Sequence, residues 1–270
     1  MSLAELARGN TVRRNNHRVR ELAVSVHPKG TAMYRRTNET IDTHPLGNPI
    51  WESLSTRHRD LAVGGRQAKR YRPDVAPFVA VASPEVQAGE LARIVDDEER
   101  VCILSVSPKL SSDWTTVKEL GIVQMLWQQE VCPEGAVPDI TRLTESDYPA
   151  MLELTALVYP AYFREGTARL GAYFGIRIDG SLRVMAGIRM ACPGFQEISA
   201  VCTHPDFRSR GFARHLVAHV VRHIQSQHDT PFMHTEDYNE PALSLYERLG
   251  FARRRTLPFW VIERSALGQG

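Results

Sequence analysis

Residues 204–216 read HPDFRSRGFARHL and place three arginines around one glycine where an amphipathic helix is expected to begin. The N-terminus of a helix carries about half a positive charge and ordinarily attracts acidic side chains. Here Arg208, Arg210 and Arg214 add positive charge instead, and Gly211 leaves the turn without side-chain bulk. The pattern predicts that a negatively charged ligand binds at the start of this helix.

The same segment has the form Arg-x-x-Gly-x-Ala, which favours a phosphate-binding loop. The first N–H groups of a helix have no partner within the helix and point outward together. Gly211 lets the backbone approach a ligand closely, Ala213 keeps the first turn small, and arginine side chains pair with anionic oxygens. The pattern is neither a Walker A loop, which needs Gly-Lys-Ser/Thr, nor a GxGxxG dinucleotide fingerprint.

The composition is that of an ordinary soluble globular protein, with 43% hydrophobic and 24% charged residues in 270. A formal net charge of +2 is too small to imply a nucleic acid or a membrane surface as partner. No apolar run reaches the roughly 18 residues of a membrane span, and the N-terminus lacks the apolar core of a secretory signal. The four cysteines are widely spaced, so we expect reduced thiols and a cytoplasmic protein.

Composition and turn signals divide the chain into three parts. Residues 1–44 are polar and basic without a sustained period, and we expect a loosely docked, flexible leader. Residues 45–136 alternate short apolar runs with helical patterns and predict a small α/β lobe. The segment CPEGAVPD at 132–139 is rich in proline and glycine and marks a boundary, so a second domain is predicted over 137–266.

In the N-terminal lobe we expect three helices and three strands. A helix opens at Asn48 with Pro49 in its first turn, which is a common helix start. Further helices are predicted over 83–97 and 111–121. The expected strands are 75–83, 100–106 and 123–130.

The second half gives a clearer order of elements. Asp179-Gly180 predicts a tight hairpin between two strands within 172–191. The helix predicted over 211–227 has one continuous apolar face. The remaining predicted elements follow in chain order: strand 140–143, helix 144–158, a short helix around 160–170, strand 195–205, strand 231–235, helix 240–250 and strand 258–264.

Two motifs in this half resemble those of the GNAT superfamily of acetyl-CoA-dependent N-acyltransferases. AVCTHPDFRSRGFARHLV at 200–217 is similar to its pyrophosphate-binding motif, and NEPALSLYERLGF at 239–251 is similar to its later motif. Their separation and the order of elements also match. The resemblance implies an α/β (α+β) fold class: a C-terminal GNAT fold with a mixed, mainly antiparallel sheet flanked by helices, after a smaller α/β N-terminal lobe. The chain looks like a member whose N-terminal half is a degenerate GNAT-like lobe.

The resemblance also implies how acetyl-CoA binds. The strands at 195–205 and 231–235 would splay apart, and the pantetheine arm of coenzyme A would lie between them, bonded by backbone groups of Val201 and Thr203. Main-chain N–H groups from Arg208 to Ala213 would hold the pyrophosphate. The full set of expected cofactor-binding residues is Val201, Cys202, Thr203, Arg208, Ser209, Arg210, Gly211, Phe212, Ala213, Asn239, Ala242 and Tyr246.

Glu197 and Tyr246 are the expected catalytic residues. In the histone-acetyltransferase branch of the superfamily, a glutamate eleven residues before the first loop arginine is the general base, and Glu197 has this offset from Arg208. The alternative for Glu197 is a solvated strand carboxylate, in which case the base would be Glu236, Asp237 or a water chain. The matching motif makes Tyr246 the proton donor to the coenzyme A thiolate, whereas helical spacing alone would make it a core residue.

The three histidines of one helix, Cys202 and Asn239 each have a structural explanation beside a functional one. His215, His219 and His223 share a helix face, but no carboxylate or cysteine completes a metal shell, so no metal site is expected. Cys202 could be an acyl-carrying nucleophile, but its place in an alternating strand favours a buried thiol. Asn239 could cap the following helix, bond the pantetheine arm, or do both.

The predicted function is transfer of the acetyl group of acetyl-CoA to a primary amine of a small-molecule acceptor, directly within a ternary complex. One alternative is an N-acyltransferase that uses a longer acyl-CoA on an amino acid such as glycine. Another is a non-catalytic, acyl-CoA-binding regulatory protein. We expect a monomer or homodimer with no metal, nucleic acid or membrane partner, whose N-terminal lobe shapes the acceptor pocket.

Overall fold

The structure is a computed structural model that describes residue 42 and residues 44–129, 139–158 and 162–265. The predicted leader (1–44) lies almost entirely outside these residues, as do positions 132–138 of the predicted boundary segment. Within the described chain, no helix is both long and apolar enough to cross a membrane.

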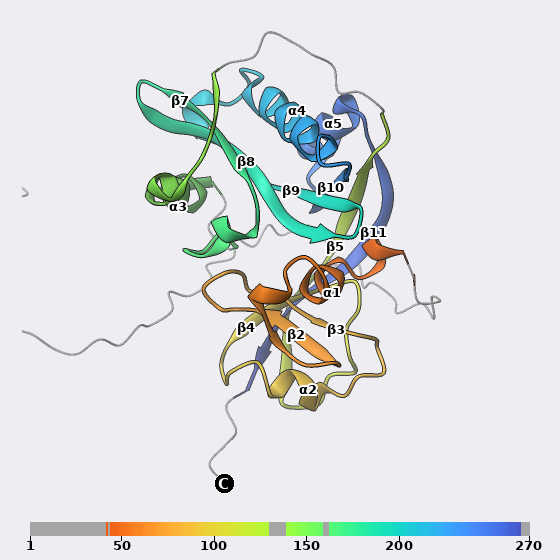
Figure 1. Cartoon of the computed structure of the whole chain (residues 1–270). Coiled ribbons are helices and arrows are strands. Elements are labelled where there is room, and N and C mark those ends of the chain that lie inside the picture. Colours follow the sequence, from red (N-terminus) through yellow and green to blue (C-terminus); the bar gives the residue numbers. More distant parts are fainter. Residues whose placement is uncertain (1–41, 43, 130–138, 159–161, 266–270) are drawn as a thin grey trace, which may run out of the picture.

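An eight-stranded sheet forms the centre of the molecule (Figure 1). Its strand order is β4-β11-β5-β10-β9-β8-β7-β6, and β9–β10 is the single parallel pair among its described strands. The strands are β4 (Arg100–Leu104), β5 (Trp114–Trp127), β6 (Ile140–Arg142), β7 (Tyr173–Ile178), β8 (Ser181–Cys192), β9 (Phe195–Thr203), β10 (Thr230–Glu236) and β11 (Phe251–Arg264). The mixed, mainly antiparallel sheet expected from the sequence is therefore confirmed.

Helices cover both faces of this sheet, because alternate strand residues point to opposite sides. On β10, Met233 packs with the core beneath α4 and α5, whereas Phe232 packs with the core beneath α1. The α-helices are α1 (Pro49–Ser55), α2 (Ala88–Ala92), α3 (Tyr148–Val158), α4 (Phe212–Gln225) and α5 (Glu240–Leu249). The 3₁₀ turns are η1 (Pro45–Gly47), η2 (Arg59–Leu61), η3 (Glu145–Asp147), η4 (Thr167–Leu170) and η5 (Pro205–Phe207).

Several local predictions are confirmed at the element boundaries. Pro49 occupies the first position of α1, and the side chain of Asn239 caps α5 by accepting from the Ala242 amide. Asp179 and Gly180 both have positive φ between β7 and β8, as the predicted tight hairpin requires.

The helix predicted over 111–121 is wrong. This segment contains the first half of β5, a strand that continues to Trp127. Thr115, Thr116 and Val117 are β-branched, and such side chains lose rotamer freedom in a helix but pack well in a strand. The Ser-Ser-Asp sequence before them is a tight turn rather than a helix cap.

The central sheet also crosses the predicted division at 136/137. β5 lies between β10 and β11, which come more than a hundred residues later, and β4 pairs with the outer edge of β11. Residues from both predicted domains therefore share one sheet, and neither set completes it without the other.

A second, smaller sheet packs against β4 and against the ends of β5 and β11 that contain Trp114 and Ile262, in the lower part of Figure 1. It contains β1 (Ala62–Gly64), β2 (Ala68–Tyr71) and β3 (Val79–Val81) in that order, and of these the sequence predicted only the region of β3. Short α2 covers its core, and the helix expected over 83–97 is reduced to this single turn and a half. This sheet and α1 place N-terminal residues against the central sheet.

Candidate active site

The two parallel strands at the centre of the sheet separate before they end. Their register runs from Phe195 opposite Thr230 to Ile198 opposite Met233 and stops there. β9 nevertheless continues to Thr203, and β10 continues to Glu236. Ala200 has a positive φ of 51°, and the β8–β9 register shifts beside it, so a bulge bends β9 away from β10. The predicted splay is present, and it exposes a backbone edge of β9.

The start of α4 lies just beyond the end of β9. Gly211 caps α4 with a φ of 79°, a left-handed conformation that glycine adopts without strain. Within the described chain, the amides of Ser209 to Arg214 have no backbone acceptor. A Cβ built on Gly211 would meet open space. The loop thus presents a row of free N–H donors to solvent at a positive helix end, as an anion site requires.

The arginine side chains of this loop are exposed and only loosely held. Arg208 donates from Nε to the Thr203 carbonyl at 3.4 Å. Arg210 donates to the Asp206 carbonyl at 3.1 Å and lies over the Phe207 ring at 5.0 Å. These contacts leave their positive charge near the unpaired amides. The loop can therefore stabilise a polyanion with both main-chain and side-chain groups.

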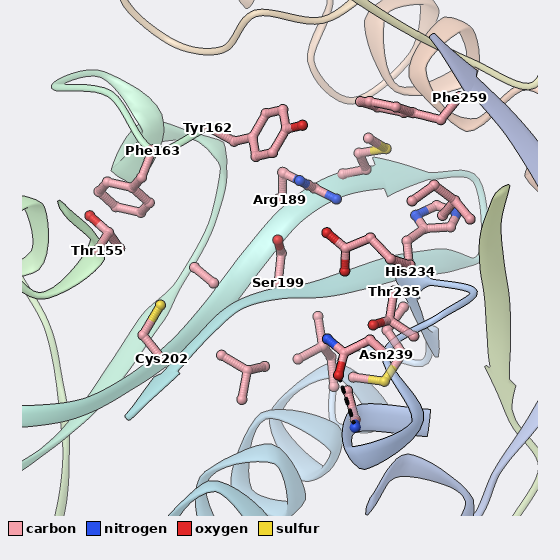
Figure 2. Close-up of a pocket in the computed structure, with 18 of the residues that line it drawn as sticks. Thr155, Tyr162, Phe163, Arg189, Ser199, Cys202, His234, Thr235, Asn239 and Phe259 are labelled. Atoms are coloured by element: carbon pink, nitrogen blue, oxygen red, sulfur yellow. Dashed lines mark hydrogen bonds between the residues drawn. The ribbon is translucent and has the colours of Figure 1, made fainter. Parts of the chain in front are cut away.

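A cavity of about 350 Å³ begins at the gap between β9 and β10 and extends to the N-terminal part of the chain (Figure 2). We call the part beside the gap the donor half, because the acyl donor is expected there. It is lined by Ser199–Cys202, Thr235–Glu236, Asn239, Ala242 and Tyr246. Its acceptor half is lined mainly by Phe78, Leu104, Lys118, Leu120, Tyr162 and Phe259. In Figure 2, Tyr162 and Phe259 lie on one side of Arg189, and Asn239 lies on the other.

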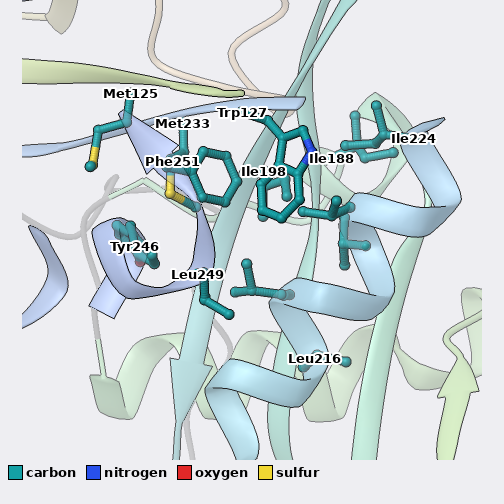
Figure 3. Packing of buried hydrophobic residues seen from close by; sticks show 14 of the residues in the cluster. Met125, Trp127, Ile188, Ile198, Leu216, Ile224, Met233, Tyr246, Leu249 and Phe251 are labelled. Carbon is teal, nitrogen blue, oxygen red and sulfur yellow. The ribbon is translucent and has the colours of Figure 1, made fainter. Parts of the chain in front are cut away.

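Tyr246 lines the donor half of the cavity. It is 9% exposed, and its ring packs against Phe251 in the core between α5 and the sheet (Figure 3). Burial raises the pKa of its hydroxyl, and the nearby Cys202 and Glu236 raise it further. The hydroxyl therefore keeps its proton at neutral pH, as a proton donor must. The structure describes a residue that can serve both the core and the cavity.

Glu197 differs from both descriptions that the sequence suggested. Its carboxylate is fully buried rather than solvated, and it accepts bonds from Arg189 Nε at 2.8 Å and Arg189 Nη2 at 2.6 Å. Burial alone raises the pKa of this carboxyl, but Arg189 and His234 outweigh it and lower the pKa to about 2. A carboxylate with so low a pKa and two partners is a poor acceptor for an ammonium proton. Glu197 also does not line the cavity described above. These features favour a structural role, and the base role expected of Glu197 stays a prediction.

Glu197 instead joins three strands at the level where the sheet opens. Arg189 comes from β8 and His234 from β10, and His234 Nδ1 lies 2.8 Å from Glu197 Oε1. The Gln124 amide on β5 lies 3.0 Å from His234 Nε2, so the imidazole accepts there and donates from Nδ1. These contacts fix the strands just below the splay and support the floor of the cavity.

Glu236 is one of the two carboxylates that the sequence offered as a base in place of Glu197. It ends β10, is half-buried and lines the cavity. Its negative charge contributes to the raised pKa of Tyr246 and of Tyr162, so it lies near both rings. In the sequence, Glu236 directly follows the strand predicted over 231–235 and comes three residues before Asn239.

The expected absence of a histidine metal site stays a prediction, although the described residues contain no group of three or more metal-ligating side chains. His219 and His223 pack edge-on against Phe174, with ring centroids 4.6 Å and 5.0 Å away. Cys202 is buried, and burial raises the pKa of its thiol to about 12. A thiol of this kind is unreactive at neutral pH, which agrees with the structural interpretation of this residue.

Comparison with known proteins places this geometry in a family. The model of the FR47-like protein family matches residues 173–261, which include β7 to β10, the loop, α4 and α5. The sequence matches no curated protein. A structure from Kribbella flavida, a GCN5-related N-acetyltransferase, is 16% identical over 77% of this chain and 93% of its own, with a TM-score of 0.53. A Drosophila protein is 16% identical over 74% of each chain, with a TM-score of 0.56. These two likenesses concern the fold alone.

A GNAT-family structure from Novosphingobium aromaticivorans is much more similar. It is 34% identical and covers 83% of this chain and 100% of its own, with a TM-score of 0.77. The match therefore includes residues from the N-terminal part as well as the motifs. Because this identity extends over the whole length of the Novosphingobium protein, the chain belongs to the GNAT family, whose fold supports acyl transfer.

Proposed function

We propose that the protein is an N-acetyltransferase that moves the acetyl group of acetyl-CoA to a primary amine of a small molecule, directly within a ternary complex. One observation carries this proposal: a single cavity joins the gap beside the anion-binding loop to a protonated tyrosine and to a carboxylate. The donor and the acceptor can therefore meet without an acyl-enzyme intermediate. The three described cysteines are free and buried, which supports work in a reducing compartment such as the cytoplasm.

The donor half would hold acetyl-CoA largely through backbone groups. The free amides of Ser209 to Ala213 would bind the pyrophosphate, with the exposed arginines neutralising its charge, whereas the Arg208 amide already donates to the Pro205 carbonyl. The open edge of β9 at Val201 and Thr203 would bond the pantetheine arm, which enters the gap between the strands. Asn239 and Ala242 line the same passage at the start of α5. Cys202 contributes a buried wall rather than a nucleophile.

Glu236 and Tyr246 would move the two protons of the reaction. Glu236 takes a proton from the amine, directly or through water, so that the nitrogen lone pair can attack the thioester carbonyl. A carbon–nitrogen bond forms, and the carbon–sulfur bond breaks. Tyr246 then gives its hydroxyl proton to the departing thiolate, and the second proton that the nitrogen loses as the amide forms returns to the Tyr246 oxygen through water. Glu197 has no chemical step in this scheme, because it holds Arg189 and His234 in place below the cavity.

A pH–rate profile of Glu236→Gln tests this proposal. With acetyl-CoA and a panel of amines, kcat/KM of the variant should fall by roughly 10²- to 10⁴-fold near neutral pH. Activity should recover as the pH rises and the amine loses its proton unaided. Asp237→Asn is the matched control, since Asp237 is the exposed neighbouring carboxylate. A Glu236→Gln profile that overlays the wild type would remove Glu236 from the reaction.

The same thiol-release assay separates the other two functions. Greater activity with a longer acyl-CoA than with acetyl-CoA would identify the protein as a different kind of N-acyltransferase. Tight acetyl-CoA binding by calorimetry with no thiol release from any amine would instead identify a non-catalytic binding protein. Either result would replace the proposed acetyl transfer.

A further inference from the structure

We infer that the acceptor is a free amino acid with an aromatic or large aliphatic side chain, and that Lys118 binds its carboxylate. This inference rests on the proposed acetyl transfer and adds the chemical class of the acceptor. It follows from the acceptor half of the cavity, where an aromatic wall lies beside a lysine.

Three aromatic rings form the apolar wall. Phe78 and Tyr162 stack with ring centroids 6.1 Å apart and planes 9° apart. Tyr162 and Phe259 meet edge to face, with centroids 6.2 Å apart and planes at 81°. Leu104 and Leu120 line the cavity with them. A surface of this kind binds an apolar side chain by removing it from water. Glycine or a polyamine would leave it uncovered.

Lys118 supplies a positive charge to this half. It lies on β5, where alternate residues share a face, so Lys118, Leu120 and Ile122 all line the cavity. Lys118 is half-buried, and among the described residues it has neither an ion pair nor a hydrogen bond. An ammonium group in partly apolar surroundings is stabilised by an anionic partner. A carboxylate on the substrate meets this need.

The strand register orders the charges along the cavity. Ile122 on β5 is paired with Glu236 on β10, and Lys118 is four residues further along β5. At the rise of an extended strand this is about 13 Å, a separation that the two long side chains reduce. The proposed base therefore lies toward the donor half, and the ammonium lies toward the far end. An amino acid has complementary groups: an amine for Glu236, a carboxylate for Lys118 and a side chain for the wall.

Four acceptors test the inference with the wild-type protein: phenylalanine, leucine, glycine and phenethylamine. Phenethylamine keeps the ring and the amine of phenylalanine but lacks the carboxylate. In the thiol-release assay, kcat/KM for phenylalanine or leucine should exceed that for glycine by about 10- to 100-fold. Phenylalanine should also exceed phenethylamine by at least about 10-fold.

Lys118→Met isolates the carboxylate contact. The variant should raise KM for phenylalanine by roughly 10- to 100-fold with little change in kcat, and KM for phenethylamine should stay the same. Lys109→Met is the matched control, because Lys109 is an exposed lysine outside the cavity. Unchanged acetyl-CoA affinity by calorimetry would show that the variant is folded.

The outcomes separate this inference from the function on which it rests. Equal effects of Lys118→Met on phenylalanine and phenethylamine would overturn the carboxylate contact. Thiol release with spermidine or another amine, but not with amino acids, would overturn the acceptor class and leave acetyl transfer standing. Absence of both thiol release and acetyl-CoA binding would overturn the two together.

Discussion

The two halves of the cavity are built in different ways. The donor half comes from two short segments, the end of β9 and the end of β10 with the first turns of α5, and the loop before α4 beside it offers backbone N–H groups. The acceptor half is assembled from side chains at Phe78, Lys118, Tyr162 and Phe259, which span about 180 residues of sequence. A helix start binds phosphate through groups that every residue has, whereas the acceptor half depends on particular side chains from distant strands. Substitutions in the acceptor half can therefore change which acceptor binds while the binding of the coenzyme A phosphates stays the same.

Gly211→Glu should break the donor half completely. The carboxylate would enter an anion site at a positive helix end, and the left-handed φ of 79° is one that residues with a side chain rarely adopt. We expect acetyl-CoA binding to fall below detection by calorimetry. Gly180→Glu is a matched control, because Gly180 has a similar φ of 75° and the same open space but lies in the β7–β8 turn. Equal affinity in both variants would refute the phosphate-loop assignment.

Tyr246→Phe should slow the chemical step without weakening the binding of acetyl-CoA. Its hydroxyl acts only as the thiolate leaves, so kcat should fall by roughly 10²- to 10⁴-fold while acetyl-CoA affinity stays near the wild-type value. Tyr238→Phe provides a control, since Tyr238 is an exposed tyrosine outside the cavity. Single-turnover kinetics would check the chemical step directly. Full retention of that rate would make Tyr246 a core residue only.

Glu197→Gln should lower the free energy of unfolding, because Glu197 holds together the strands that lie beneath both halves of the cavity. It removes the fully buried carboxylate that pairs with half-buried Arg189, and breaking a buried ion pair typically costs about 3–5 kcal/mol at neutral pH. Because folding lowers the pKa of Glu197 from 4.5 to about 2, its contribution is complete above pH 4.5 and is lost as the pH falls toward 2. The difference between variant and wild type should shrink over that window.

Denaturant unfolding at pH 7 and pH 3 measures this difference. Glu247→Gln is the control, because the Glu247–Arg253 pair is exposed and should contribute less than about 1 kcal/mol. A stability loss for Glu197→Gln no larger than the control would mean that the buried pair does not hold the strands together.

Local patterns allowed much of the donor half to be predicted from sequence. Gly211 and the arginines around it, the cap at Asn239 and the order of strands and helices after 139 depend on neighbouring residues. The resemblance supplied the splay between β9 and β10, and the register of these strands confirms it.

Other features depend on contacts that no local pattern contains. The burial of Glu197 follows from Arg189 and His234 on neighbouring strands, and sequence spacing alone gave its offset but not its surroundings. The aromatic wall needs Phe78, Tyr162 and Phe259 to converge. The sequence analysis predicted a helix and a separate strand where the structure has the single strand β5. The partners that pair with β5, β10 and β11, come far later in the chain, so no local pattern shows this pairing.

The position of β5 also has a consequence for how the protein folds as it is made. β11 is the final strand of the described chain, and β5 pairs with it from Trp114 to Trp127. During synthesis on the ribosome, both edges of β5 would stay unpaired until more than a hundred further residues had been added. Such long-range pairing slows folding and leaves a strand edge available for aggregation. The pocket that both halves share would thus be among the last parts of the newborn chain to form.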